Sequence, residues 1–125
     1  MSLGATIRST RVAERVRTEL MDLLLRGSVR DPRTEGVFVS DVTMSIDLRY
    51  ARIYVRLTRG EVGEEERLST IRALTRASGY LRRELAPRLK LRYMPELKFV
   101  WDDQVDHAAR IDLLLDEIRR EQEDH

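Results

Sequence analysis

Apolar residues recur at steps of three and four over residues 10–26, near the start of the chain. This spacing predicts an amphipathic helix with one apolar stripe, because a helix makes one turn in 3.6 residues. Ser9 or Thr10 is suited to cap the first turn, and Gly27 is suited to end the helix. Residues 1–9 are then expected to form a flexible leading segment.

Two segments with the period of a strand follow this helix. Residues 37–43 are rich in β-branched side chains and come after a run of turn formers. Residues 48–57 alternate, with polar and aromatic side chains on one side and an apolar set on the other: Ala51, Ile53, Val55 and Leu57. The two segments predict a hairpin with one buried face.

A second helical stripe begins at residue 67, after an acidic segment at residues 60–66 that we expect to be a loop. Its apolar positions are Leu68, Ile71, Leu74, Leu81, Leu85 and Leu89. Gly79 follows Ala77 and Ser78 within this stripe, where a glycine costs about 1 kcal/mol relative to alanine. We therefore expect a kink or a break at residues 77–79, with a short second half because Pro87 cannot donate a helical hydrogen bond.

The remaining pattern predicts one more strand and one more helix. Residues 97–101 alternate as a strand, and Asp103 or Asp106 is suited to cap a last helix with an apolar stripe: Ile111, Leu114, Leu115 and Ile118. A chain of 125 residues is long enough for one domain. The order of elements predicts an α+β fold with helices packed on one face of a three-stranded sheet.

The charges are separated along the chain although they nearly cancel, with 23 Lys and Arg against 22 Asp and Glu. Residues 67–92 carry eight basic groups and one acid, whereas residues 102–125 carry three basic groups and nine acids. Because clustered basic residues favour nucleic acid, the small net charge does not exclude an RNA partner. The absence of cysteine excludes disulfides, thiolate nucleophiles and cysteine-based zinc sites. With no long apolar run either, we expect a cytoplasmic monomer without membrane association.

The basic residues gather on one face of the predicted broken helix. Arg72, Arg76, Gly79 and Arg83 are four, three and four residues apart, which places them on one side, away from the apolar stripe. A glycine lets a phosphate backbone approach closely, and arginine neutralises its charge. An ordinary solvent-facing arginine face with a packing glycine explains the spacing about as well. The candidate RNA-binding residues are Arg72, Arg76, Ala77, Ser78, Gly79, Arg82, Arg83, Arg88, Lys90 and Arg92.

Two other patterns suggest different chemistry. Residues 60–63 read Gly-Glu-Val-Gly, the G-x-x-G spacing of the nucleotide-clamping loop of KH domains, but they follow a strand and glutamates surround them. Asp102, Asp103 and His107 suggest a metal-assisted hydrolase, although acids at a strand end and a helix start are also ordinary capping residues. Since no established catalytic motif is present, we predict a protein that is not an enzyme and has no metal or other cofactor.

Five stretches of the chain, in this order, resemble the bacterial ribosome-binding factor A family. They are RVAERV at 11–16, the segment 42–55 with DLRYARIYV at its end, ASGYLRREL at 77–85, LRYMPELKF at 91–99 followed by Asp102 and Asp103, and RIDLLL at 110–115. The resemblance implies a type II KH-like domain over residues 10–118, in which the A-x-G at residues 77–79 replaces the G-x-x-G loop. An acidic tail would follow at residues 119–125.

The resemblance also implies a function. It implies a non-enzymatic assembly factor that binds the small (30S) ribosomal subunit and 16S rRNA, with other assembly factors as candidate partners. Such a factor supports late maturation of the subunit and processing of the 16S rRNA 5′ end. Pro87 departs from the expected helix pattern, and the basic C-terminal extension of some members is absent. A generic RNA-binding module of the KH type is the alternative.

Overall fold

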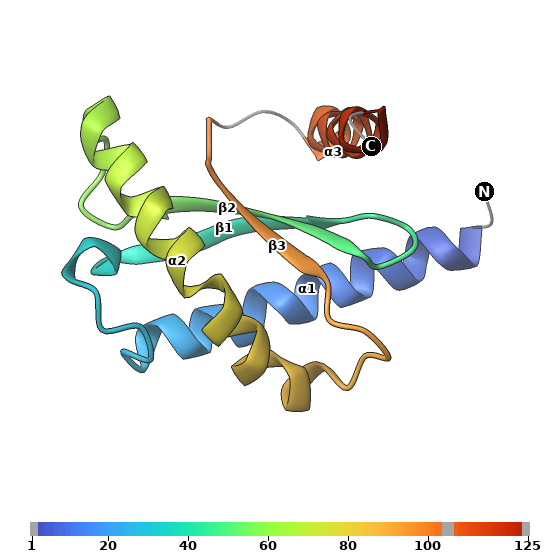
Figure 1. Cartoon of the computed structure of the whole chain (residues 1–125), viewed down its shortest axis with the longest axis horizontal. Helices are drawn as coiled ribbons and strands as arrows, with labels where there is room; N and C mark the ends of the chain where they lie inside the picture. Colours follow the sequence, from blue (N-terminus) through green and yellow to red (C-terminus); the bar gives the residue numbers. More distant parts are fainter. Residues whose placement is uncertain (1–2, 104–106, 124–125) are drawn as a thin grey trace.

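Helices on both sides of a three-stranded sheet make up the fold of the computed structural model, which describes residues 3–103 and 107–123 (Figure 1). The elements are α1 (Leu3–Leu25), a short 3-10 turn (Pro32–Thr34), β1 (Val37–Met44), β2 (Tyr50–Leu57), α2 (Glu64–Leu89), β3 (Glu96–Trp101) and α3 (His107–Glu123). The predicted α+β class, hairpin and third strand are confirmed.

The sheet has the order β1-β2-β3. β1 and β2 are antiparallel, whereas β2 and β3 are parallel, with Ile53 opposite Phe99. A parallel pair needs a crossover connection, and α2 supplies it. A register shift between Val39 and Asp41 places Asp41 opposite Tyr54, so these two side chains share the face of the sheet that points away from α1 and α2.

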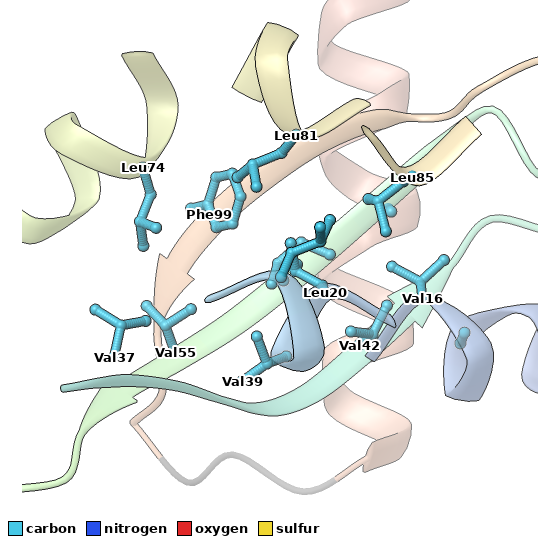
Figure 2. Close-up of a cluster of buried hydrophobic side chains, with 14 of the residues drawn as sticks. Val16, Leu20, Val37, Val39, Val42, Val55, Leu74, Leu81, Leu85 and Phe99 are labelled. Carbon is cyan, nitrogen blue, oxygen red and sulfur yellow. The ribbon is translucent and has the colours of Figure 1, made fainter. Parts of the chain in front are cut away.

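The core lies between the sheet and the first two helices (Figure 2). Val16 and Leu20 of α1 and Leu74, Leu81 and Leu85 of α2 are completely buried. They pack on the alternating apolar residues of the hairpin and on the third strand: Val37, Val39, Val42, Ala51, Ile53, Val55, Leu57 and Phe99. The predicted buried face of the hairpin is therefore confirmed, and so is the stripe of the second helix except for Leu68, which is 46% exposed.

The last helix lies on the other face of the sheet (Figure 1), which differs from the prediction that the helices pack on one face. Arg110 of α3 contacts Asp41, and its guanidinium lies 4.1 Å from the centre of the Tyr54 ring. Tyr54 is consequently 5% exposed, although the alternation predicted a solvent-facing side chain. Leu114 from the predicted stripe is also buried, and α3 extends to Glu123, so the tail predicted at residues 119–125 is helical over residues 119–123.

The first helix begins seven residues before the predicted start. Ser9, expected as a cap, is buried inside α1, and its hydroxyl donates to the Thr6 carbonyl at 2.9 Å. Residues 3–9, predicted as flexible, are therefore helical. The apolar spacing did not reveal that residues 3–9 are helical, because most of their side chains are exposed. For the last helix, Asp103 precedes the first turn by four residues, and Asp106 lies outside the described residues.

The predicted break in the second helix is wrong, because α2 is continuous from Glu64 to Leu89. Glu64, Glu65 and Glu66 form its first turn rather than a loop, and acids are favoured there by the helix dipole. Each fully buried leucine on its inner side contributes roughly 1.5–3 kcal/mol. Burial of Leu74, Leu81 and Leu85 thus outweighs the cost of about 1 kcal/mol for Gly79. Whether the continuous helix bends there stays a prediction.

Candidate nucleic-acid interface

One side of α2, together with its C-cap residue, presents four exposed basic residues, which we name the α2 cationic face: Arg72, Arg76, Arg83 and Lys90. Arg72 and Lys90 are eighteen residues apart, or about 27 Å along a helix of 1.5 Å rise. Within the part of the chain that the structure describes, none of the four forms an ion pair with a carboxylate. The pKa of Asp31 is lowered mainly by its hydrogen bond from Arg33 and also by the charge of Arg76, which acts on it without an ion pair. The four charges are therefore available to an external anion.

Gly79 lies exposed in the middle of this face, as predicted. A Cβ built at residue 79 would meet only the Arg83 Nη1 atom, at 3.8 Å, so packing within the protein does not require glycine. Its two neighbours are less accessible, because Ala77 packs against the core and Ser78 donates to the Thr75 carbonyl at 2.7 Å. Of the predicted A-x-G segment, Gly79 is the residue placed to meet a ligand.

Arg88 is directed to α1 rather than to solvent. Its Nη1 lies 3.0 Å from Glu19 Oε2 and 2.7 Å from Asp22 Oδ2. These hydrogen bonds raise the pKa of Arg88, and the bond from Arg88 is the main cause that lowers the pKa of Asp22. The Arg88 carbonyl also accepts from Arg15 Nη2 at 2.6 Å. Arg88 is thus neutralised locally, and it links α2 to α1.

Arg82 of α2 contacts the connection between α2 and β3, and Arg92 is part of that connection. Arg82 is half-buried and donates to the Met94 carbonyl at 3.2 Å. Arg92 is exposed, and its guanidinium lies 5.4 Å from the centre of the Tyr93 ring. All ten candidates lie on one segment of the sequence. The structure separates the exposed α2 cationic face from candidates such as Arg82 and Arg88, whose side chains contact other parts of the protein.

The Gly-Glu-Val-Gly segment at residues 60–63 connects β2 to α2, as predicted for a strand-to-helix loop. Gly63 is the N-cap residue of α2. Glu61 accepts from Arg56 at 3.3 Å and from Arg67 at 2.7 Å. The segment therefore presents a carboxylate held by two arginines, which does not suit a phosphate ligand.

The acidic residues considered for metal-assisted hydrolysis have arginine partners. Asp102 is 8% exposed and accepts from Arg110 and from the Ser40 hydroxyl. Asp103 Oδ1 lies 3.5 Å from Arg67 Nη1. The side chain of His107 lies outside the described residues. Among those that are described, no three His, Asp or Glu residues are placed to hold a metal ion.

The helices of residues 3–103 and 107–123 include none long and apolar enough to cross a membrane. The fold and the exposed side of α2 define a class, that of small α+β domains with one extended cationic helix face. More specifically, the chain belongs to the ribosome-binding factor A family, because the family model described as "Ribosome-binding factor A" matches residues 8–115.

Individual relatives agree with this membership. A ribosome-binding factor A from Gloeobacter violaceus is 42% identical over 120 residues, which cover 94% of this chain and 91% of the relative. The crystal structure of ribosome-binding factor A from Thermus thermophilus superposes with a TM-score of 0.61 at 27% identity, over 74% of this chain and 93% of that one.

A second structure of the Thermus thermophilus protein is described as a homology model fitted into the cryo-EM map of its complex with the 30S subunit. It superposes with a TM-score of 0.52 at 30% identity, over 73% of this chain and 97% of that one. The resemblance noted from sequence is therefore confirmed.

Proposed function

We propose that this chain binds the small ribosomal subunit by docking the α2 cationic face on 16S rRNA. There it supports late maturation, including processing of the 16S rRNA 5′ end, as a cytoplasmic factor and not as an enzyme. The observation that carries the proposal is an exposed row of Arg72, Arg76, Arg83 and Lys90 without carboxylate partners among the described residues, in a chain of this family. The 30S complex of the Thermus thermophilus relative supports the choice of partner.

The residues of this surface have different roles in the proposal. The four cations of the α2 cationic face neutralise phosphates, and each contact contributes about 0.7–0.9 to the slope of log affinity against log salt. Gly79 leaves the helix backbone open to a phosphate–sugar chain. Four of the remaining candidates hold this surface in place through the contacts described above: Ala77, Ser78, Arg82 and Arg88. Arg92, beyond the end of α2, is exposed and adds a further cation for the RNA.

Co-sedimentation with small subunits across a salt series tests the surface. We expect the double variant Arg76→Glu/Arg83→Glu to lose at least about tenfold in affinity and about 1.5 in salt slope. The matched control is Arg11→Glu/Arg17→Glu, which makes the same charge change on exposed positions of α1. Equal affinity of the α2 variant and the wild type would refute docking through this face.

The same experiment separates the specific function from a generic RNA-binding module. A ribosome factor keeps its preference for small subunits in the presence of excess unstructured RNA, whereas a generic module is competed away in proportion to the added phosphate. The hydrolase alternative predicts metal-dependent hydrolysis that the variant Asp102→Asn abolishes. We expect the wild-type chain to show no such hydrolysis.

A further inference from the structure

Three arginines from separate parts of the chain meet around a surface pocket of about 280 Å³. Arg8 comes from α1, Arg49 from the turn between β1 and β2, and Arg92 from the connection between α2 and β3. Figure 1 shows this turn and this connection at the same end of the molecule as the N-terminal part of α1. Because Arg8 and Arg49 lie far from residue 92 in sequence, no spacing pattern indicated the cluster.

The pocket has an excess of positive charge. All three arginines are exposed, and none forms an ion pair with a carboxylate of the described residues. The acid in the pocket wall, Asp47, uses its Oδ1 to accept from the Ser45 hydroxyl at 2.7 Å and from the Arg49 backbone N–H at 3.1 Å. Asp47 therefore holds the turn together, and the guanidinium groups are left to an external anion.

The pocket also offers a surface for a flat ring. Tyr93 is 68% exposed, which is a high fraction for an aromatic side chain. The Arg92 guanidinium lies over its ring, at 5.4 Å from the centre. Leu48 and Leu91 add apolar wall. An exposed aromatic ring next to arginines is the combination with which proteins bind unpaired bases and their phosphates.

Two residues at the pocket have the left-handed backbone conformation that side chains other than glycine rarely adopt. Leu48 and Lys90 are the non-glycine residues with positive φ in the described chain, at 61° and 52°. Leu48 lines the pocket, and Lys90 immediately precedes Leu91 in its wall. Such conformations gather at binding sites, where the surrounding structure holds them. Here the Glu96 backbone N–H donates to the Arg49 carbonyl at 2.8 Å, so the turn and the connection are fixed to each other and the pocket is preformed.

We propose that this pocket binds one unpaired nucleotide of a single-stranded RNA segment. The base stacks on Tyr93, and the flanking phosphates contact Arg8 and Arg49. The inference rests on the proposed function in taking RNA as the ligand, and it adds a second contact point beyond the C-terminal end of the α2 cationic face. It also names the RNA structure that is recognised there, an unpaired base.

Binding of fluorescein-labelled RNA hexamers, followed by fluorescence anisotropy, tests the pocket. The probes are A6, U6 and a six-base-pair RNA duplex. We expect the wild-type chain to prefer A6 over the duplex, because a duplex has no base free to stack. Tyr93→Ser should weaken A6 binding at least about fivefold, and Tyr93→Phe should keep it, because the ring and not the hydroxyl provides the stacking.

The charge contribution is tested with Arg8→Gln and Arg49→Gln, each expected to weaken A6 binding about three- to tenfold. Arg17→Gln is the matched control, with the same charge change on an exposed position of α1 outside the pocket, and it should stay within about twofold of the wild type. Circular dichroism confirms that the variants, all at exposed positions, are folded. Equal losses for Arg17→Gln and Arg49→Gln would show diffuse charge attraction and overturn the proposal.

Other outcomes also decide the matter. Duplex binding as tight as A6 binding, or no measurable A6 binding, overturns the proposal. Competition by AMP at the concentrations at which A6 itself competes, counted per nucleotide, identifies a free nucleotide as the ligand instead of an RNA strand. Competition by inorganic phosphate at such concentrations identifies a site for the phosphate group alone, and either result overturns the proposal. The proposed function fails separately: if Arg76→Glu/Arg83→Glu leaves subunit binding unchanged while Arg49→Gln weakens A6 binding, the docking face is wrong and the pocket stands.

Discussion

Replacing Gly79 by alanine should stabilise the protein. The residue is exposed in the interior of a continuous helix, and its φ is not positive. The new methyl group would meet only the end of the flexible Arg83 side chain, at an ordinary contact distance of 3.8 Å. The variant therefore gains helix propensity without a steric cost, and the expected gain in free energy of unfolding is about 0.8–1 kcal/mol. For a chain of this size that raises Tm by about 3–5 °C.

The same substitution at Gly36 provides the control, because its surroundings predict the opposite sign. Gly36 has a φ of 79°, and an added Cβ would lie 3.1 Å from Thr58 Oγ1. We expect Gly36→Ala to lose about 1–2 kcal/mol. Urea and thermal denaturation followed by circular dichroism measure both variants. A Gly79→Ala variant that is less stable than the wild type would contradict a regular helix at residue 79.

Subunit binding by Gly79→Ala then separates folding from function. Since nothing in the protein requires glycine at this position, a loss of affinity in a stabilised variant would indicate that the RNA backbone approaches residue 79 closely. Gly79→Leu should lose more affinity than Gly79→Ala, because its side chain extends further from the helix. Unchanged affinity in both variants would refute the close approach and leave the basic groups as the whole of the docking face.

Two further predictions concern stability. Arg110→Ala should cost about 3–5 kcal/mol of unfolding free energy in urea denaturation, because it removes the buried guanidinium that pairs with the carboxylates of both Asp41 and Asp102. A loss below about 1 kcal/mol would show that α3 contributes little to the folded domain. Asp22 has a lowered pKa, mainly through its hydrogen bond from Arg88, so its stabilising effect is complete above its unfolded pKa of about 3.9 and is lost as the pH falls through the folded value. Tm measured from pH 7 to pH 2 should therefore decline less steeply for Asp22→Asn than for the wild type, and parallel curves would exclude Asp22 as a source of the acid sensitivity.

The sequence predicted the elements whose periodicity comes from burial on one side. Ala51, Ile53 and Val55 alternate because one face of β2 packs on the core, and the spacing of Leu74, Leu81 and Leu85 follows the buried side of α2. The break at Gly79 was predicted from local propensity, which the packing of these leucines overrides. Propensity describes an isolated segment, and the packing partners of α2 lie elsewhere in the chain.

Which arginines are free could not be predicted from their own segment. Arg76 and Arg88 are alike in local sequence terms, but Arg88 meets Glu19 and Asp22, more than sixty residues earlier in the chain, and Arg76 does not. The position of α3 could not be predicted for the same reason, because it depends on a contact between residues far apart in the sequence. Its attachment depends on the contact of Arg110 with Asp41, 69 residues apart, on a face of the sheet that alternation alone assigned to solvent.

The placement of α2 and α3 on opposite faces of the sheet makes the molecule an electric dipole. With its C-cap residue Lys90, α2 carries seven basic groups and four acids, whereas α3 carries five acids and three basic groups. Near a polyanion such a dipole experiences a torque that turns α2 toward the surface and α3 away from it. The orientation of an encounter would thus be selected while the partners are still separated by solvent, within a Debye length of about 8 Å at physiological salt. An acidic C-terminal segment in this position would raise the fraction of collisions that begin with the correct face.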